Sequence, residues 1–373
     1  VGVEAVRCRR AGHCMHGEPV TASMASQPSL KGWQTWGGRH AFLCDGRVMV
    51  GPDWGVTCFA VALTTVLSVA FWIFVCPTLA GAPLVTSVGM LLYALTLTLL
   101  VATATADPGI LPRAPYVDDA ESLANASAER FVEVRGVTMP LKWCSTCRIW
   151  RPPRASHCTE CNVCVERFDH HCPWTGQCVG LRNYRYFFGF VLSVCSLCAY
   201  TLVVSALSFL HALAVALTDA TSGGDRVGVA LDERPVPAAL SIATALILLC
   251  VCPLLCYHCS LTCRNATTSE EIKGTFADRA NPFDQSCPAN CRHVLCRPLP
   301  PSRLHLRSAA AEELGGPMIL RNDGGGGEGG GGVELPMAAA DEGPPPLRTA
   351  TLPGSEGKRR PAREQSSPDD VPV

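Results

Sequence analysis

Residues 144–178 hold an unusual concentration of side chains that bind metals or act as nucleophiles. Two tetrahedral zinc ions need eight ligands, and C-x2-C pairs are a typical source of such ligands. The segment offers ten candidates, so two residues are left over. The ten are Cys144, Cys147, His157, Cys158, Cys161, Cys164, His170, His171, Cys172 and Cys178.

A surplus cysteine and a surplus histidine that lie close together have the chemistry needed for nucleophilic catalysis. The thiolate is the reactive form of cysteine, and a neighbouring imidazole generates or stabilises it. Asp169 stands directly before two histidines, and a carboxylate can fix the tautomer of an imidazole. The sequence therefore predicts a catalytic group of Asp169, one of His170 and His171, and Cys172. The count leaves open which histidine is free.

The composition of the 373-residue chain argues against a disulfide scaffold, a nucleic-acid binder and an ordinary soluble protein. The chain, with 22 cysteines, is too long for a small disulfide scaffold, and cytosolic thiols stay reduced, which disfavours a disulfide framework. A net charge of −1 provides no basic field for nucleic acid. Only 17% of the residues are charged, against about a quarter in soluble domains, which indicates a membrane protein.

Four apolar runs must position the cysteine-rich segment. Each run lacks Asp, Glu, Lys and Arg and is long enough to cross a bilayer, which takes about 20 residues of helix. We expect an α-helical multi-pass membrane protein with four transmembrane helices and a small cytosolic cysteine-rich domain that binds two zinc ions. The runs cover residues 56–79, 83–106, 186–218 and 237–257.

The loops between the runs differ in charge. The segment between the second and third runs holds ten Lys and Arg residues, whereas the loop between the third and fourth runs is rich in acidic residues. Basic loops stay on the cytosolic side of a membrane. We therefore expect the cysteine-rich loop and both termini to lie in the cytosol.

The motif Asp169-His170-His171-Cys172-Pro173-Trp174 resembles that of the DHHC-type protein S-acyltransferases, or palmitoyltransferases. The resemblance covers about residues 33–296. Three shorter family motifs occur at the expected places after the second and fourth runs. They are Asp107-Pro108-Gly109, Thr267-Thr268-Ser269-Glu270 and Asn281-Pro282-Phe283-Asp284.

The resemblance implies a role for each residue of the loop. In the family the first histidine of the pair is free, so His170 would be the base, Asp169 would polarise it and Cys172 would be the nucleophile. The resemblance also divides the remaining residues into two zinc sets. One set is Cys144, Cys147, His157 and Cys164, and the other is Cys158, Cys161, His171 and Cys178.

The implied activity is S-palmitoylation, in which a long-chain fatty acyl group moves from acyl-CoA to a cysteine of a membrane-associated protein. The reaction would be ping-pong, with an acyl group on Cys172 as the intermediate. The two zinc ions would be structural, and palmitoyl-CoA would be the co-substrate. The expected partners are membrane-associated protein substrates and the lipid bilayer, without nucleic acid. Relatives suggest the Golgi or another endomembrane, with the plasma membrane as an alternative.

The acyl chain is expected to lie among the four helices. Thirteen residues of helix cover about 20 Å, so Ser193 and Leu197 are candidates for setting its length, with ordinary helix packing as the alternative. Four arginines of the basic segment are candidates for contact with CoA phosphates, with plain surface charge as the alternative. They are Arg148, Arg151, Arg154 and Arg182.

These features predict six consecutive regions. A cytosolic N-terminal segment (1–54) precedes two transmembrane helices (55–107) and the zinc domain (108–185). Two further transmembrane helices with a luminal loop (186–260) and a cytosolic C-terminal segment (261–301) follow. The remaining region is a disordered Gly- and Pro-rich tail (302–373).

Two other classes of function compete with the enzyme. A membrane-anchored zinc adaptor would use the loop to bind partners, but it would not need the surplus group of Asp169, His170 and Cys172. A RING-like ubiquitin ligase would share the interleaved order of ligands, but closely spaced cysteine clusters beside membrane spans do not fit it.

Overall fold

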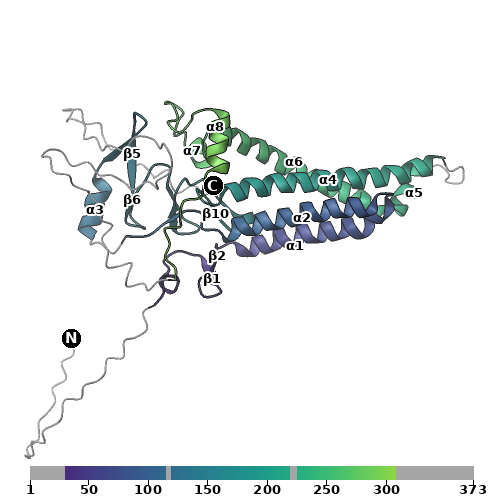
Figure 1. Ribbon diagram of the computed structural model, residues 1–373, viewed down its shortest axis with the longest axis horizontal. Helices are drawn as coiled ribbons and strands as arrows, with labels where there is room; N and C mark the ends of the chain where they lie inside the picture. Colours follow the sequence, from purple (N-terminus) through teal and green to yellow (C-terminus); the bar gives the residue numbers. More distant parts are fainter. Residues whose placement is uncertain (1–29, 115–118, 219–224, 308–373) are drawn as a thin grey trace, which may run out of the picture.

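The computed structural model describes residues 30–114, 119–218 and 225–307. In this part of the chain, four long helices form an elongated bundle (Figure 1). Ten short strands gather at one end of the bundle, and we call them and their connections the strand domain.

Four helical segments are long and apolar enough to cross a membrane, as expected, with mean hydropathies from 2.1 to 2.5. Large apolar side chains such as Leu91 and Leu249, which are 70% and 71% exposed, cover their outer faces and suit contact with lipid. The protein is therefore a multi-pass membrane protein. The segments are α1 (Trp54–Ala70) with its short extension to Thr78, α2 (Ala82–Thr105), α4 (Tyr184–Thr218) and α6 (Pro235–Cys263).

Helix α4 packs against both α2 and α6 in the bundle. Its Tyr200 hydroxyl donates a hydrogen bond of 2.7 Å to the Val85 carbonyl of α2, and the Tyr200 ring meets Phe71 edge-on. Helix α6 continues to Cys263, beyond the apolar run that ends at residue 257. It does so because His258 is buried against the protein and need not face lipid.

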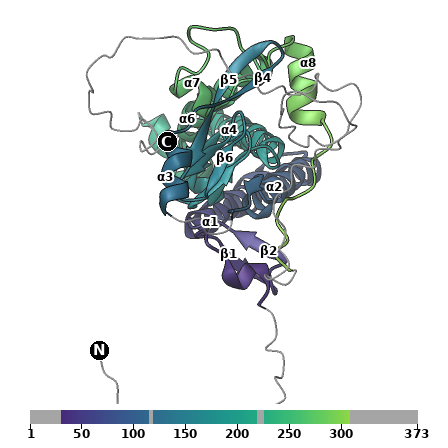
Figure 2. The same cartoon turned by 90° about the vertical axis from the view of Figure 1, so that its left-hand side faces the viewer.

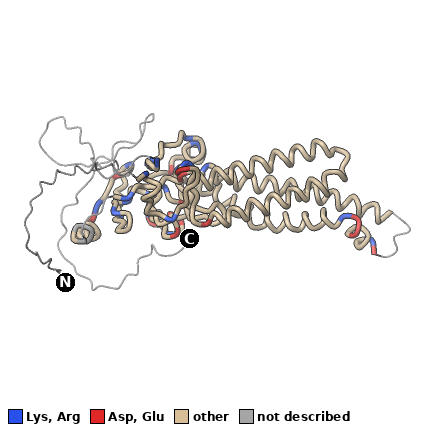
Figure 3. The backbone as a smooth tube through the Cα atoms, turned by 90° about the horizontal axis from the view of Figure 1, so that it is seen from below, with Lys and Arg blue, Asp and Glu red and all other residues tan. Residues whose placement is uncertain are grey.

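Charged residues lie at the two ends of the bundle and not along its length (Figure 3). The end away from the strand domain holds α5 (Arg226–Glu233). Asp225 caps this helix, because its Oδ1 accepts a hydrogen bond of 2.8 Å from the Gly228 N–H. The uncharged middle is what a bilayer core requires.

The strand domain consists of small antiparallel sheets (Figures 1 and 2). Such short strands bury little apolar surface, and six cysteines contribute to the buried clusters between them. Helix α3 (Asp119–Ser127) lies at its edge. The sheets are β1 (Ala41–Leu43) with β2 (Val48–Val50); β4 (Arg130–Val134), β5 (Val137–Cys144) and β6 (Ile149–Arg151); β3 (Ile110–Leu111), β8 (Val163–Val165) and β7 (Ser156–Cys158); and β9 (His170–Cys172) with β10 (Gln177–Val179).

The Asp107-Pro108-Gly109 motif joins the end of α2 to the strand domain. Oδ1 of Asp107 accepts hydrogen bonds of 2.9 Å from the backbone N–H groups of Gly109 and Ile110. Gly109 adopts φ +107°, a conformation that favours glycine. Oδ2 of Asp107 lies 3.3 Å from Nε of Arg182. Arg182, a candidate for contact with CoA phosphates, is therefore already paired with the Asp107 carboxylate.

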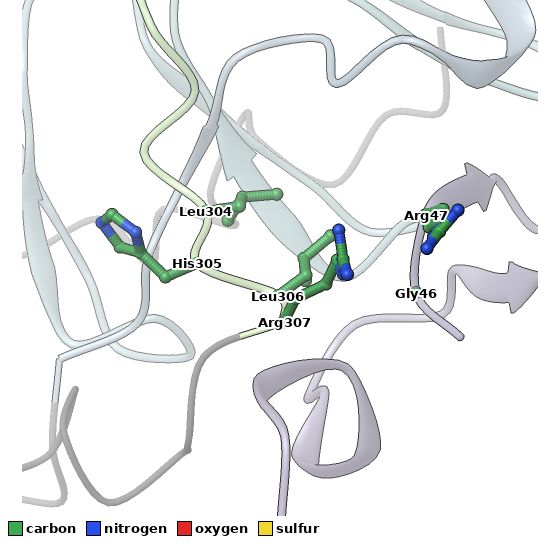
Figure 4. A pocket seen from close by; sticks show the side chains of 6 residues that line it. All are labelled: Gly46, Arg47, Leu304, His305, Leu306 and Arg307. Carbon is green, nitrogen blue, oxygen red and sulfur yellow. The ribbon is translucent and has the colours of Figure 1, made fainter. Parts of the chain in front are cut away.

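The chain after α6 folds back onto the strand domain. It forms α7 (Thr268–Ile272) and α8 (Cys287–Cys291), and α8 packs on α6. Farther on, the Trp33 N–H donates a 3.0 Å hydrogen bond to the Leu306 carbonyl. A shallow pocket nearby is lined by none of the candidate site residues (Figure 4); its lining is Gly46, Arg47, Leu304, His305, Leu306 and Arg307.

The structure bears only in part on the predicted terminal segments. Residues 302–307, at the start of the expected disordered tail, lie against the strand domain, where Ser302 donates to Asp107 at 2.6 Å. The rest of that tail, residues 308–373, lies outside the described residues, as do residues 1–29 of the N-terminal segment.

A buried ion pair ties α7 to the strand domain. The guanidinium of Arg154 donates through Nε and Nη2 to the two carboxylate oxygens of Glu270, at 2.7 and 2.8 Å. It also donates to Oδ1 of Asn265 at 3.0 Å. The two charged side chains are only 7% and 8% exposed. The expectation that Arg154 meets CoA phosphates is therefore wrong, because its donors are already used inside the protein.

We expect Glu270→Gln to destabilise the protein by about 3–5 kcal/mol, because it leaves the Arg154 charge buried without a partner. Thermal unfolding of the purified, detergent-solubilised protein measures this loss. The matched control is Glu271→Gln, which removes an exposed ion pair with Arg264 and should cost less than about 1 kcal/mol. Equal losses in the two variants would contradict this account.

Candidate active site and metal sites

Eight Cys and His side chains of the strand domain form two compact groups able to bind metal ions. In each group, one candidate ligand atom per residue lies within 4.8 Å of all the others. The structure brings together the same residues that the sequence assigned to each zinc set. The groups are Cys144, Cys147, His157 and Cys164, and Cys158, Cys161, His171 and Cys178.

The distances within the groups suit tetrahedral zinc. Nδ1 of His157 lies 3.4–3.7 Å from three sulfurs, and Nδ1 of His171 lies 3.3–3.8 Å from three others. Zinc with bonds of about 2.1 Å to nitrogen and 2.3 Å to sulfur separates these ligand atoms by about 3.6 Å. Three sulfurs and one imidazole nitrogen are also a typical zinc donor set. The residues therefore fit the ion.

Strand pairing explains how the two groups interleave. In the β7–β8 pair, His157 stands opposite Cys164, while its neighbour Cys158 points to the other face. In the β9–β10 pair, His171 stands opposite Cys178. Neighbouring residues on one strand thus reach different groups.

The same alternation separates the two histidines of β9. His171 points toward Cys178 and its group, so His170 and Cys172 point to the opposite face of the strand. His170 and Cys172 are close enough for the imidazole to lower the pKa of the thiol and for the thiol to raise the pKa of the imidazole. Nδ1 of His170 lies 2.7 Å from Oδ2 of Asp169. The structure thus places His170 beside Asp169 and on the same face as Cys172, and His171 in a metal group.

Burial opposes the charged forms of all three groups, but their mutual hydrogen bonds outweigh it. Although burial lowers the pKa of His170, the Asp169 carboxylate and the Cys172 thiol raise it to about 9. Burial raises the pKa of Asp169 and of Cys172, yet the His170 hydrogen bond leaves both below their ordinary values. The shifts of the three pKa values therefore all act toward the charged forms: a thiolate, an imidazolium and a carboxylate.

The fully buried Asp169 is held by the start of α7. Oδ2 accepts a hydrogen bond of 2.8 Å from the Thr268 hydroxyl, and Oδ1 accepts one of 3.0 Å from the Thr268 N–H. The Asp169 carbonyl accepts a further bond of 3.0 Å from the Ser269 N–H. Thr267 and Glu270 form a capping box that fixes this helix start.

The Asn281-Pro282-Phe283-Asp284 motif is hydrogen-bonded to the turn that leads into α7. Nδ2 of Asn281 donates to the carbonyls of Arg264 and Asn265, at 2.9 and 3.2 Å. Nδ2 of Asn265 donates in turn to the Phe283 carbonyl at 2.8 Å. These bonds hold the turn between α6 and α7, from which Thr268 reaches Asp169.

Two residues beside these groups were not predicted from the sequence. Asp53 Oδ2 lies 2.8 Å from Nε2 of His171, a contact that orients a metal-binding imidazole. His258 is 2% exposed, and Nδ1 lies 3.1 Å from the Tyr184 hydroxyl. A nitrogen of His258 lies within 4.8 Å of an Asp169 oxygen and a His170 nitrogen. The one feature of the sequence that could have indicated His258 is its position directly after the apolar run 237–257.

Comparison with known proteins decides the family. Residues 137–275 match the family model described as DHHC palmitoyltransferase. Palmitoyltransferase ZDHHC18 of Mus musculus is 35% identical over 324 residues, which cover 80% of this chain and 81% of the relative. Palmitoyltransferase ZDHHC9 of Danio rerio is 35% identical over 314 residues, which cover 79% of each chain.

The chain belongs to the DHHC palmitoyltransferase family. It is a protein S-acyltransferase, as its sequence predicted.

In this palmitoyltransferase, Cys172 lies at the membrane end of the strand domain. Its side chain belongs to a buried cluster with Tyr184, Phe187 and Val191 of the first turns of α4, packed against apolar residues of α6. Ser193 and Leu197 are buried farther along α4, 3% and 8% exposed. Buried side chains of α4 thus continue from the thiol into the bundle.

We expect Thr268→Val in this DHHC palmitoyltransferase to slow acylation of Cys172 about tenfold or more. The change removes a hydrogen bond to the charged Asp169, and such bonds contribute about 1.5–3 kcal/mol. The rate of labelling by an alkyne-tagged palmitoyl-CoA measures the effect. Thr268→Ser, which keeps the hydroxyl, should retain most of the rate, and an equal loss in both variants would contradict this role.

Proposed function

We propose that this S-acyltransferase moves a long-chain acyl group from acyl-CoA to cysteines of membrane-associated proteins through an acyl-Cys172 intermediate. The observation that carries the proposal is that the Cys172 thiol shares a face of β9 with His170, which is itself paired with the buried carboxylate of Asp169. The thiol also adjoins the apolar start of α4. One residue therefore faces both a base and a place for a fatty chain.

In the first step, the Cys172 thiolate attacks the thioester carbonyl carbon of acyl-CoA and forms a new carbon–sulfur bond. The bond to the CoA sulfur breaks, and His170 supplies the proton that neutralises the leaving thiolate. Asp169 holds the imidazole in place and stabilises its protonated form. Thr175, whose hydroxyl donates to the Cys172 carbonyl at 3.3 Å, helps to keep the pKa of the Cys172 thiol below its ordinary value.

In the second step, a cysteine thiol of the protein substrate gives its proton to His170 and attacks the acyl carbonyl. The bond to Cys172 breaks, and the enzyme returns to its thiolate–imidazolium state. The reaction exchanges one thioester for another, so it needs no oxidant or reductant. Membrane-associated proteins and acyl-CoA are thus the two substrates.

Two zinc ions would be held by the two groups of three cysteines and one histidine. With four protein ligands each and no open position, they would be structural and stabilise the fold of the strand domain. The protein's own part is to hold the loop: His171 and Cys178 fix β9 against β10, which sets the place of His170 and Cys172.

The acyl chain would follow α4 into the bundle. Ser193 and Leu197 stand one helical turn apart, so they share a face of the helix. About 20 Å of helix separates Leu197 from Tyr184, close to the length of an extended palmitoyl chain. Both side chains are buried, and we propose that they limit the chain length.

The proposed orientation places the strand domain, and with it both termini, in the cytosol. The basic residues between the second and third spans belong mostly to the strand domain, and α5, which carries Asp232 and Glu233, lies at the opposite end of the bundle. The compartment we propose is the Golgi or another endomembrane, with the plasma membrane as the alternative.

We expect purified wild-type protein to acquire a hydroxylamine-sensitive label from alkyne-tagged palmitoyl-CoA, and Cys172→Ser to acquire none at that site. The thioester to Cys172 is cleaved by hydroxylamine, whereas an oxygen ester to serine resists it. Peptide mass spectrometry locates the label. The exposed Cys44, which lies outside the site, gives the control Cys44→Ser, which should label normally. Equal labelling of wild type and Cys172→Ser would overturn the intermediate.

We expect tightly held zinc at about two ions per chain after a wash with a weak chelator. Cys172→Ala should keep both ions, since its thiol is in neither group, whereas Cys147→Ser should lose about one. Elemental mass spectrometry of the purified protein gives the count. Loss of zinc from Cys172→Ala, or none from Cys147→Ser, would contradict the assignment of the groups.

A further inference from the structure

Three thiols outside the catalytic loop meet where α8 packs against the end of α6. Cys263 is the last residue of α6, and Cys287 and Cys291 are the first and last residues of α8. Their three sulfur atoms all lie within 4.8 Å of one another. Neither the acyl-transfer reaction nor the two buried groups uses any of them.

Hydrogen bonds of the Asn290 amide and of the backbone bring these thiols together. The buried Asn290 of α8 donates through Nδ2 to the Cys263 carbonyl at 2.8 Å. Its Oδ1 accepts from the Gln285 N–H at 3.1 Å, and its own N–H donates to the Ser286 carbonyl at 2.8 Å. Cys287 and Cys291 are four positions apart, so they share one face of α8. The fold therefore presents the three sulfurs as a preformed set.

Neither apolar packing nor a disulfide accounts for the set. The three cysteines do not serve as buried apolar side chains of a core, because Cys287 is exposed and Cys263 and Cys291 are only half-buried. A disulfide would pair two of the thiols and leave the third, and all three are free in the structure. Disulfides are also rare in the cytosol, where we place this end of the bundle.

Three convergent thiolates are a donor set for a soft cation. Thiolate sulfur selects ions such as zinc and copper(I) and disfavours magnesium and calcium. We propose that Cys263, Cys287 and Cys291 form a third metal site, which binds zinc with its fourth position open to solvent.

The proposed site differs in kind from the two buried groups. Its residues are exposed or half-buried, and no fourth Cys, His, Asp or Glu of the described residues joins it, so its zinc exchanges while that of the buried groups stays. The bound ion joins α8 to α6, next to the turn that supports Thr268 and Asp169. Zinc uptake there fixes the position of the C-terminal segment.

The test uses the full-length protein in detergent micelles, washed with a weak chelator and then titrated with Zn²⁺. Two readouts follow: zinc per chain, and the rate at which iodoacetamide alkylates each of the three cysteines, resolved by peptide mass spectrometry. The variants are the double substitution Cys287→Ser with Cys291→Ser and the control Cys44→Ser, an exposed thiol outside the set.

We expect wild type and Cys44→Ser to take up one further exchangeable zinc, and the double variant to take up none while it keeps its tightly held zinc. Zinc at ten times its dissociation constant should slow alkylation of all three thiols about tenfold, and Mg²⁺ should not. The alkylation readout on wild type stands even if the double variant fails to fold. No further uptake by wild type, unchanged uptake by the double variant, protection of fewer than three thiols, or acyl groups already on these cysteines would overturn the proposal.

Discussion

Side chains along a β-strand alternate between two faces, and the chemistry of this protein depends on that alternation in β9. His171 lies on one face, opposite Cys178 and among the sulfurs of a metal group, while His170 and Cys172 share the other. The strand is held on its metal-group side, and the pair that we propose to react lies on the other. Because the strand domain has little apolar core, the position of the reactive pair depends on that group.

The second constraint is the buried carboxylate of Asp169, which needs several donors to remain charged away from water. They come from His170 beside it and from the start of α7, 99 positions along the chain. The ion pair of Arg154 and Glu270 anchors that helix to the strand domain. The segment after the last membrane helix is thus part of the active site, although no residue in it reacts.

The sequence predicted the four spans and the members of the site, because uncharged runs and clustered cysteines are local signals. The count of ligands alone could not separate His170 from His171, since a three-residue strand is too short to show alternation, and only the family resemblance favoured His170. The contacts of Asp53 and His258 with the site were not predicted, because they arise only when distant segments pack together. Arg154 was misjudged for the same reason: its carboxylate partner lies 116 positions away. Contacts between distant segments decided what local patterns left open.

Only a short segment of chain joins Cys172 to the membrane helix α4. Strand β10 ends at Val179 and α4 begins at Tyr184, and Asn183 between them is fully buried and hydrogen-bonded to the backbone of Cys178 and Thr103. Trp174, two residues from Cys172, is 53% exposed, as suits an aromatic ring at a lipid headgroup layer. The thiol therefore sits at one fixed depth relative to the bilayer. In the reaction we propose, an acceptor cysteine must reach that depth, so its distance from the lipid surface is a condition for transfer.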